Sequence, residues 1–153
     1  MSEKERRRRK VAQLVMIQSW RYKKRDPSSI SLSLALTLSW ATFQSRVYMH
    51  KAKARGVTFE GRQRVLEVQS KLPEERISLR MLHEKDNEFD ENAMKIYAVV
   101  DGSYKACVGY LQKEMASLIA PQVDNGKRCI AFYENVTGGY GRRWGLNFSY
   151  ALL

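Results

Sequence analysis

Alternation of apolar and polar residues dominates the C-terminal two thirds of the chain. From Ile77 to Met81, every second residue is apolar, and this two-residue period is typical of a half-buried strand. A later apolar run ends at the turn signal Asp101-Gly102, which favours a hairpin. The pattern predicts strands at residues 77–81, 93–100, 104–110, 128–136 and 144–150.

A longer apolar period marks two predicted helices in the same region. Residues 63–72 fit a short helix that ends at Pro73, because proline cannot continue a helix. Residues 112–123 carry apolar side chains at helical spacing, and we expect Pro121 to distort the last turn. Asn125-Gly126 is a stop signal for this second helix.

The first third of the chain is also predicted to be helical. Residues 1–26 carry a weak helical stripe, and a breaker at residues 26–29 follows it. Residues 31–55 fit both a strand period and a helical stripe, but the pattern is too long for an ordinary strand. We therefore predict a helix over residues 31–55. Its candidate N-caps are Ser29 and Ser31.

Together these elements predict an α+β fold. Several short strands separated by turns, with one or two helices, suggest a small partly closed β-barrel. We expect residues 1–55 to form a basic helical arm and residues 56–153 to form the barrel domain. Residues 57–59 have the β-branched and aromatic character of a strand. The glycine-rich residues 138–141 are expected to join the last two strands.

The distribution of charge along the chain indicates what kind of partner the protein binds. The chain of 153 residues has a formal net charge of +11. The excess lies in residues 1–55, which is typical of a protein that binds a polyanion such as nucleic acid. In the arm, Trp20 and Tyr22 interleave with basic residues and would add stacking to charge; a disordered solubilising tail is the plainer alternative. Candidate phosphate contacts there are Arg6, Arg7, Arg8, Arg9, Lys10, Arg21, Lys23 and Lys24.

The sequence favours a binding protein over an enzyme. It has no metal-ligand spacing, phosphate-binding loop or defensible nucleophile–base pair, so we expect no catalysis, no metal and no cofactor. Cys107 and Cys129 lie in apolar runs, which favours buried free thiols in a reducing compartment. We find no membrane span or secretory signal. We expect a cytoplasmic protein, bacterial or phage-encoded, or a nuclear one in a eukaryote.

The most distinctive stretch is Asn-Glu-Phe-Asp-Glu-Asn-Ala-Met-Lys-Ile at residues 87–96. Asn and Asp side chains hydrogen-bond nearby backbone, so this stretch predicts a structured loop that leads into a strand. It puts Phe89 beside Asp90, a pair suited to holding a base and a sugar hydroxyl. The alternative is a loop whose polar side chains only cap backbone groups, with Phe59 and Phe89 in the core.

A second distinctive element is Val-Gly-Tyr-Leu-Gln-Lys-Glu at residues 108–114. Together with residues 87–96 and with Gly-Val-Thr-Phe at 56–59, it makes residues 56–150 resemble a HIRAN domain. That module occurs in the helicase-like transcription factor and related remodellers, and alone in bacterial and mobile-element proteins. The resemblance implies a modified oligonucleotide-binding-like barrel that grips the 3′ end of single-stranded DNA.

The resemblance also implies roles for particular residues. Aromatic side chains would stack on bases, which contributes roughly 1–3 kcal/mol per base. An ionised carboxylate would accept a hydrogen bond from the terminal hydroxyl and repel phosphate, which favours a free end over a continuing strand. By position, the stacking residues are Phe59 and Phe89, the hydroxyl acceptor is Asp90, and Tyr110 and Lys113 line the backbone track.

The chain departs from the family pattern near these positions. Glu88 replaces a proline and adds a negative charge, and Phe89 replaces a tyrosine and lacks its hydroxyl. Thr58 replaces an arginine, which removes an expected phosphate contact.

These features predict a non-enzymatic nucleic-acid-binding protein. We expect single-stranded DNA as the favoured ligand, with RNA possible, and no membrane partner. Arg142 and Arg143, at a predicted hairpin tip, would add phosphate contacts. The alternative is a phage or mobile-element protein that docks on a nucleoprotein machine, such as an RNA-guided nuclease, and inhibits it.

Overall fold

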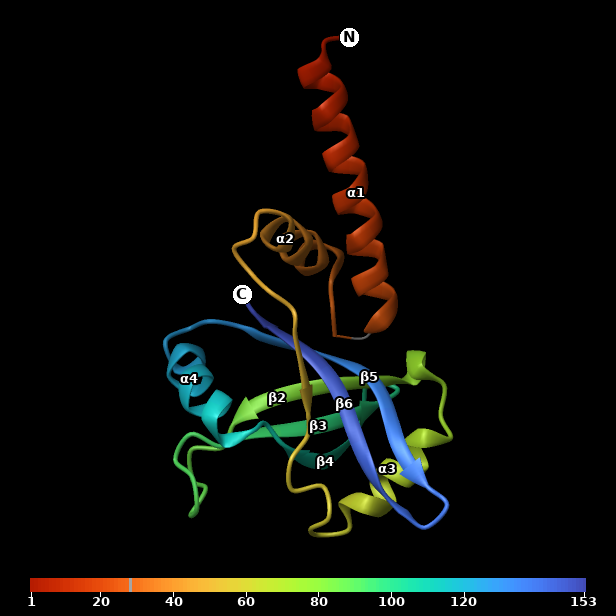
Figure 1. The fold of residues 1–153 in the computed structure, drawn as a ribbon, viewed down its shortest axis with the longest axis vertical. Helices are drawn as coiled ribbons and strands as arrows, with labels where there is room; N and C mark the ends of the chain where they lie inside the picture. The colour runs from red at the N-terminus through yellow and green to blue at the C-terminus, as the bar shows by residue number, and fades with distance from the viewer. Residues whose placement is uncertain (28) are drawn as a thin grey trace.

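The computed structural model describes residues 1–27 and 29–153. Helices α1 (Glu3–Arg25) and α2 (Leu32–Phe43) lie on one side of a sheet, and α1 projects away from it (Figure 1). The fold is α+β, as predicted. The further elements are β1 (His50–Lys53), α3 (Arg62–Ser70), the short 3-10 helix η1 (Glu74–Arg76), β2 (Ile77–His83), β3 (Met94–Val100), β4 (Tyr104–Tyr110), α4 (Lys113–Asp124), β5 (Cys129–Gly139) and β6 (Arg142–Leu152).

Within the described residues, the strands form one six-stranded antiparallel sheet in the order β1-β6-β5-β2-β3-β4. The sheet is open, and β1 and β4 are its edges. After β1 the chain crosses to β4. There, Arg55 N–H donates to the Tyr110 carbonyl at 2.8 Å, and Tyr110 N–H donates to the Arg55 carbonyl at 2.9 Å. This isolated bridge brings the segment after β1 against the end of β4.

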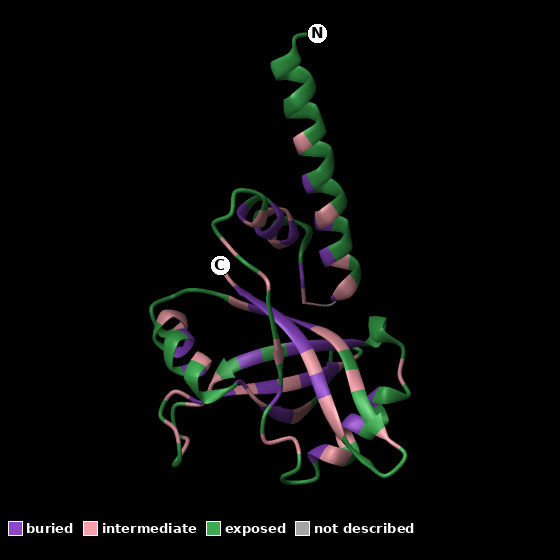
Figure 2. Ribbon diagram, in the orientation of Figure 1, coloured by how far each residue is buried: buried purple, intermediate pink, exposed green. Residues whose placement is uncertain are grey.

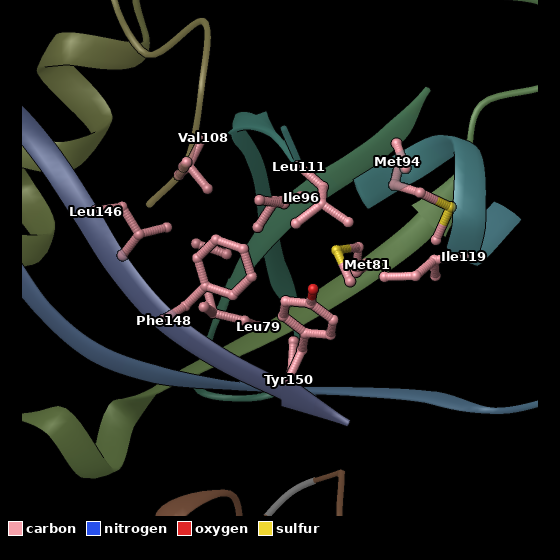
Figure 3. Packing of buried hydrophobic residues seen from close by; sticks show 14 of the residues in the cluster. Leu79, Met81, Met94, Ile96, Val108, Leu111, Ile119, Leu146, Phe148 and Tyr150 are labelled. Carbon is pink, nitrogen blue, oxygen red and sulfur yellow. The ribbon is translucent and has the colours of Figure 1, made fainter. Parts of the chain in front are cut away.

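The main hydrophobic core lies between the sheet and helices α3 and α4 (Figure 3). Leu146, Phe148 and Tyr150 alternate along β6 and point into this core, as the two-residue side-chain period of a strand requires. Leu66 of α3 and Ile119 of α4 pack against the same cluster. Each such side chain contributes roughly 1.5–3 kcal/mol when fully buried.

A second core joins the N-terminal helices to the other face of β5 and β6. Tyr22 of α1 stacks on Phe132 of β5, with ring centroids 5.3 Å apart, and Leu38 of α2 completes the contact. Tyr22 is therefore a core residue, and its predicted stacking on nucleic acid is wrong. In contrast, the outer half of α1 is exposed (Figure 2).

The predicted helix over residues 31–55 is correct at its start and wrong beyond Phe43. Ser31 caps α2, and its hydroxyl accepts a hydrogen bond from a first-turn N–H at 3.1 Å. The helix ends where Ser45 adopts a left-handed φ of 56° and the next backbone amides bond back to the Ala41 carbonyl. No glycine marks this end, so the usual sequence signal for a helix C-terminus is missing.

The residues after this helix end carry misleading apolar spacing. Val47 and Met49 pack against the second core from non-helical backbone, so their spacing continues the stripe without a helix. Residues 50–53 then pair with β6 as strand β1. The predicted breaker at 26–29 includes Ser28, which lies outside the described residues.

The other predicted helices and strands are confirmed, with small shifts of their ends. Residues 57–59 form a turn and not a strand. The β5–β6 connection is shorter than predicted, because only Tyr140 and Gly141 lie between the paired strands. Cys107 and Cys129 are free and only partly buried. Burial raises the pKa of the Cys129 thiol to about 12.

Gly109 is required where the chain crosses to β4. Its φ is +156°, and a Cβ there would lie 2.6 Å from the Arg55 carbonyl oxygen. We predict that Gly109→Ala destabilises the fold by about 1–3 kcal/mol, the usual range for overpacking, because the Arg55 backbone must move. Denaturant unfolding and hydrogen exchange of the Arg55 amide measure this effect.

Gly145→Ala is the matched control for this variant. A Cβ at Gly145 would meet only the ends of the Thr137 and Lys53 side chains, at 3.3 and 3.5 Å. Equal losses of stability in the two variants would contradict a special role for the bridge.

Candidate functional site

The loop between β2 and β3 is held by its own polar side chains. Asn87 Oδ1 accepts hydrogen bonds from the backbone N–H groups of Phe89 and Asp90, both at 2.9 Å. Asp90 Oδ1 accepts from Asn92 N–H, also at 2.9 Å. The structured loop is therefore confirmed, and so is the capping role of Asn87 and Asp90. A carboxylate has two oxygens, so one capping bond leaves Asp90 with further acceptor capacity.

Glu84 ties this loop to β3 and β4. Its carboxylate accepts from Tyr110 Oη at 2.7 Å, from Asn87 Nδ2 at 2.9 Å and from Lys95 Nζ at 3.2 Å. The hydrogen bonds from Asn87 and Tyr110 hold the pKa of Glu84 below its ordinary value. Burial, and then the bond to Glu84, raises the pKa of Tyr110 to about 12. Tyr110 is thus a neutral donor whose hydroxyl is already used by Glu84.

An open cleft of about 1040 Å³ brings the predicted site residues together. Its walls come from residues 55–62, from the 84–93 loop and from residues 110–114. Phe59 is 64% exposed and Phe89 is 90% exposed, so the alternative that these rings lie in the core is wrong. The predicted residues that line the cleft are Phe59, Phe89, Asp90, Tyr110 and Lys113.

The cleft lining is richer in acids than in bases. The acids concentrate in the 84–93 loop, so a phosphate is repelled there, whereas the bases lie on the other two wall segments. The acidic residues are Glu60, Glu84, Asp86, Glu88, Asp90 and Glu114, and the basic ones are Arg55, Arg62 and Lys113.

The other predicted contacts do not line this cleft. Arg142 and Arg143 are exposed at the start of β6, beside the hairpin tip, as predicted. Lys23 donates from Nζ to the Pro27 carbonyl at 2.8 Å and so closes the end of α1. Arg21 and Lys24 are exposed on α1. The exposed bases on the projecting end of α1 are Arg6, Arg7, Arg8, Arg9 and Lys10.

Sequence reasoning missed two of the three basic residues of the cleft wall, Arg55 and Arg62. Neither belongs to a recognised motif. Gly56 and Gly61, which are both left-handed in the structure, frame the turn between them. That pair of glycines was the available signal that residues 55–62 form a shaped segment.

Two kinds of feature are absent from the described residues. No three His, Cys, Asp or Glu side chains among them are grouped so as to hold a metal ion. No helix in the same part of the chain has the length and apolar character needed to cross a membrane.

Comparisons with known proteins assign no family. No family model matches the chain, and no curated protein matches it. One solved structure, a protein from Lactobacillus plantarum determined by a structural genomics consortium, aligns with a TM-score of 0.49 at 14% identity. The alignment covers 70% of this chain and 99% of the other. A likeness of this degree assigns neither a family nor a function.

His83 anchors the cleft loop to α4. Its Nδ1 lies 2.9 Å from Asp124 Oδ1, and its Nε2 lies 2.6 Å from the Glu91 carbonyl oxygen. Both partners are acceptors, so both bonds form only when the ring is doubly protonated. The bond to Asp124, and then the bond to Glu91, raises the pKa of His83, although burial and nearby Lys85 oppose the shift.

We predict that this anchor weakens as the pH rises. Because the folded-state pKa of His83 is raised, its stabilisation is complete below the ordinary value of 6.5 and is lost as the pH rises through the folded pKa. NMR titration of the imidazole and unfolding between mildly acidic and mildly alkaline pH measure this. His83→Gln should flatten the stability profile in that window, and an unchanged slope would contradict the assignment.

Proposed function

We propose that this protein binds nucleic acid without catalysis and holds a 3′ end or a single-stranded segment of DNA in the cleft, as a HIRAN domain does. The observation that carries this proposal is the convergence of Phe59, Phe89, Asp90, Tyr110 and Lys113 on one open cleft. The bridge between Arg55 and Tyr110 supports the finer proposal that the sheet is a partly closed, oligonucleotide-binding-like barrel.

The chemistry of the cleft suits a strand end. Two exposed aromatic rings offer sequence-tolerant stacking surfaces for bases. The acidic loop disfavours a phosphate at Asp90 but tolerates a terminal hydroxyl, which can donate to a carboxylate. The phosphates of the preceding nucleotides would lie toward the basic side chains of the other two wall segments, residues 55–62 and 110–114.

The arm would add affinity of a different kind. The bases of residues 6–10 lie on the part of α1 that projects from the sheet (Figure 1). Lys and Arg contacts to phosphate are independent of sequence and weaken as salt increases.

The second candidate function is docking on a nucleoprotein machine, with inhibition of that machine. The observation that favours it is the apolar outer surface of α1. Met16, Ile17 and Trp20 are exposed between basic ends of the same helix, and basic amphipathic helices dock into grooves of protein partners. A shift of a short oligonucleotide by the purified protein at physiological salt supports the first function. Association only with a protein complex supports the second.

We predict that Phe89→Ala weakens single-strand binding by roughly 1–3 kcal/mol, the contribution of one stacked base. Thermal stability should stay nearly unchanged, because the ring is 90% exposed. Tyr104→Ala is the control, since Tyr104 is an exposed aromatic outside the cleft. Fluorescence anisotropy with a labelled oligonucleotide and a melting curve on each variant give both quantities. Equal affinity of the Phe89 and Tyr104 variants would contradict the stacking role.

Asp90→Asn tests the end preference in the same assay. Asparagine keeps an oxygen that accepts from Asn92 but loses the charge that repels phosphate. We expect the preference for a 3′ hydroxyl over a 3′ phosphate to fall in this variant. Asp86→Asn, an exposed carboxylate of the same cleft, should leave more of that preference in place.

We predict that replacing the arginines of residues 6–9 by glutamine lowers the salt dependence of binding. The slope of log affinity against log salt should fall by about 0.7 for each lost single-strand contact. Glutamine is a good helix former, and the change spares Val15 and Tyr22, which are buried. Lys127→Gln with Arg128→Gln removes exposed charge elsewhere and serves as control. An unchanged slope in the arm variant would identify the arm as passive.

A further inference from the structure

Arg62 is a cation held inside the cleft wall. Its Nη1 donates to the Gly56 carbonyl at 2.6 Å, and its guanidinium carbon lies 5.2 Å from the centroid of the Tyr110 ring. The side chain is only 7% exposed, yet it lines the cleft. These contacts hold a guanidinium in one place and leave little freedom to lose when a ligand binds.

The charge of Arg62 is incompletely paired. Its Nη2 contacts one oxygen of Glu60 at 3.2 Å, and its buried Nε has no hydrogen-bond partner in the described structure. A guanidinium carries five N–H donors and pairs best with two oxygens of one anion. The single contact to Glu60 falls short of that arrangement, and buried donors normally have partners.

Glu60 is a weak and displaceable partner. Its side chain is 79% exposed, so water solvates the carboxylate and competes with Arg62 for its oxygens. Its backbone is left-handed, with φ of 53°, a conformation that residues with a Cβ disfavour. Nothing else in the described structure holds its carboxylate.

We propose that Arg62 is the phosphate-binding residue of the cleft, and that Glu60 occupies it as an internal carboxylate until a phosphate displaces it. The identity of the phosphate as part of a nucleic-acid strand rests on the proposed function. A phosphate group offers several oxygens, so it can engage Nη2 and, after a small shift of the turn, the unpaired Nε as well. Arg62 thereby supplies from α3 the guanidinium that is missing at Thr58.

Titration of the protein with inorganic phosphate tests the site without any oligonucleotide. The readouts are the NMR signal of the Arg62 Nε–H group and, for variants that lack this group, the backbone amide signals of residues 55–62. Glu60→Gln should bind phosphate about two- to fivefold tighter, because the competing charge of the exposed Glu60 carboxylate is removed. Arg62→Lys should bind about tenfold more weakly, because an ammonium cannot form the bidentate pair.

Glu88→Gln is the matched control, because it removes one exposed carboxylate from the same cleft without touching Arg62. The proposal is supported if phosphate affinity increases more in Glu60→Gln than in Glu88→Gln. The increase in Glu60→Gln should disappear when Arg62→Lys is added to that variant. Equal gains in the two glutamine variants would overturn it, since general repulsion would then explain both. Arg62 also stabilises the turn before α3 through its bond to the Gly56 carbonyl. A melting curve for each variant therefore shows whether weaker binding results from a less stable fold.

The same variants in the oligonucleotide assay separate the two proposals. Oligonucleotide binding that ignores Glu60 and Arg62, together with no phosphate shift at Nε–H, would overturn this inference and leave the proposed function standing. Phosphate binding at Arg62 without oligonucleotide binding would support the phosphate site and contradict the proposed function.

Discussion

The backbone bridge between Arg55 and Tyr110 is the contact on which the candidate site depends. Without it, the residues after β1 would have no fixed relation to β4, because β1 and β4 are opposite edges of the sheet. The bridge carries the 55–62 segment to the place where β4 leads into α4. Pairing of β3 with β4 brings the 84–93 loop to the same place. Gly109 permits this close approach, since a Cβ there would collide with the Arg55 carbonyl.

A polar network then makes this meeting point rigid while leaving its aromatic rings open. Glu84 and Asn87 satisfy the backbone and hydroxyl donors around them, and His83 fixes the far side of the loop. With the loop held in this way, the Phe89 side chain is 90% exposed. The exposed rings of Phe59 and Phe89 in one cleft are the feature on which the proposed binding function depends.

Charge is divided between two parts of the molecule with different physical roles. In the proposed function, the basic arm would act over a distance and be screened by salt, whereas the cleft would select by contact. Within the cleft, acids lie on the loop and the partly paired Arg62 lies on the opposing segment, so under the two proposals a ligand would meet one region that rejects phosphate and one that accepts it. That division fits the end of a strand better than its middle.

Local sequence pattern determined strands β2 to β6, helices α3 and α4, and the capped loop around Asn87, because each depends on residues close together in the chain. The sequence motifs also singled out the cleft residues Phe59, Phe89, Asp90 and Tyr110. Only the tertiary structure decided that the second helix stops at Phe43, that Tyr22 is core, and that Arg62 faces the cleft with Glu60 as its partner. The physical reason is that an apolar or charged pattern reports which face of an element needs a partner. It does not report which distant segment covers that face, and sheet order and the crossing after β1 settle that.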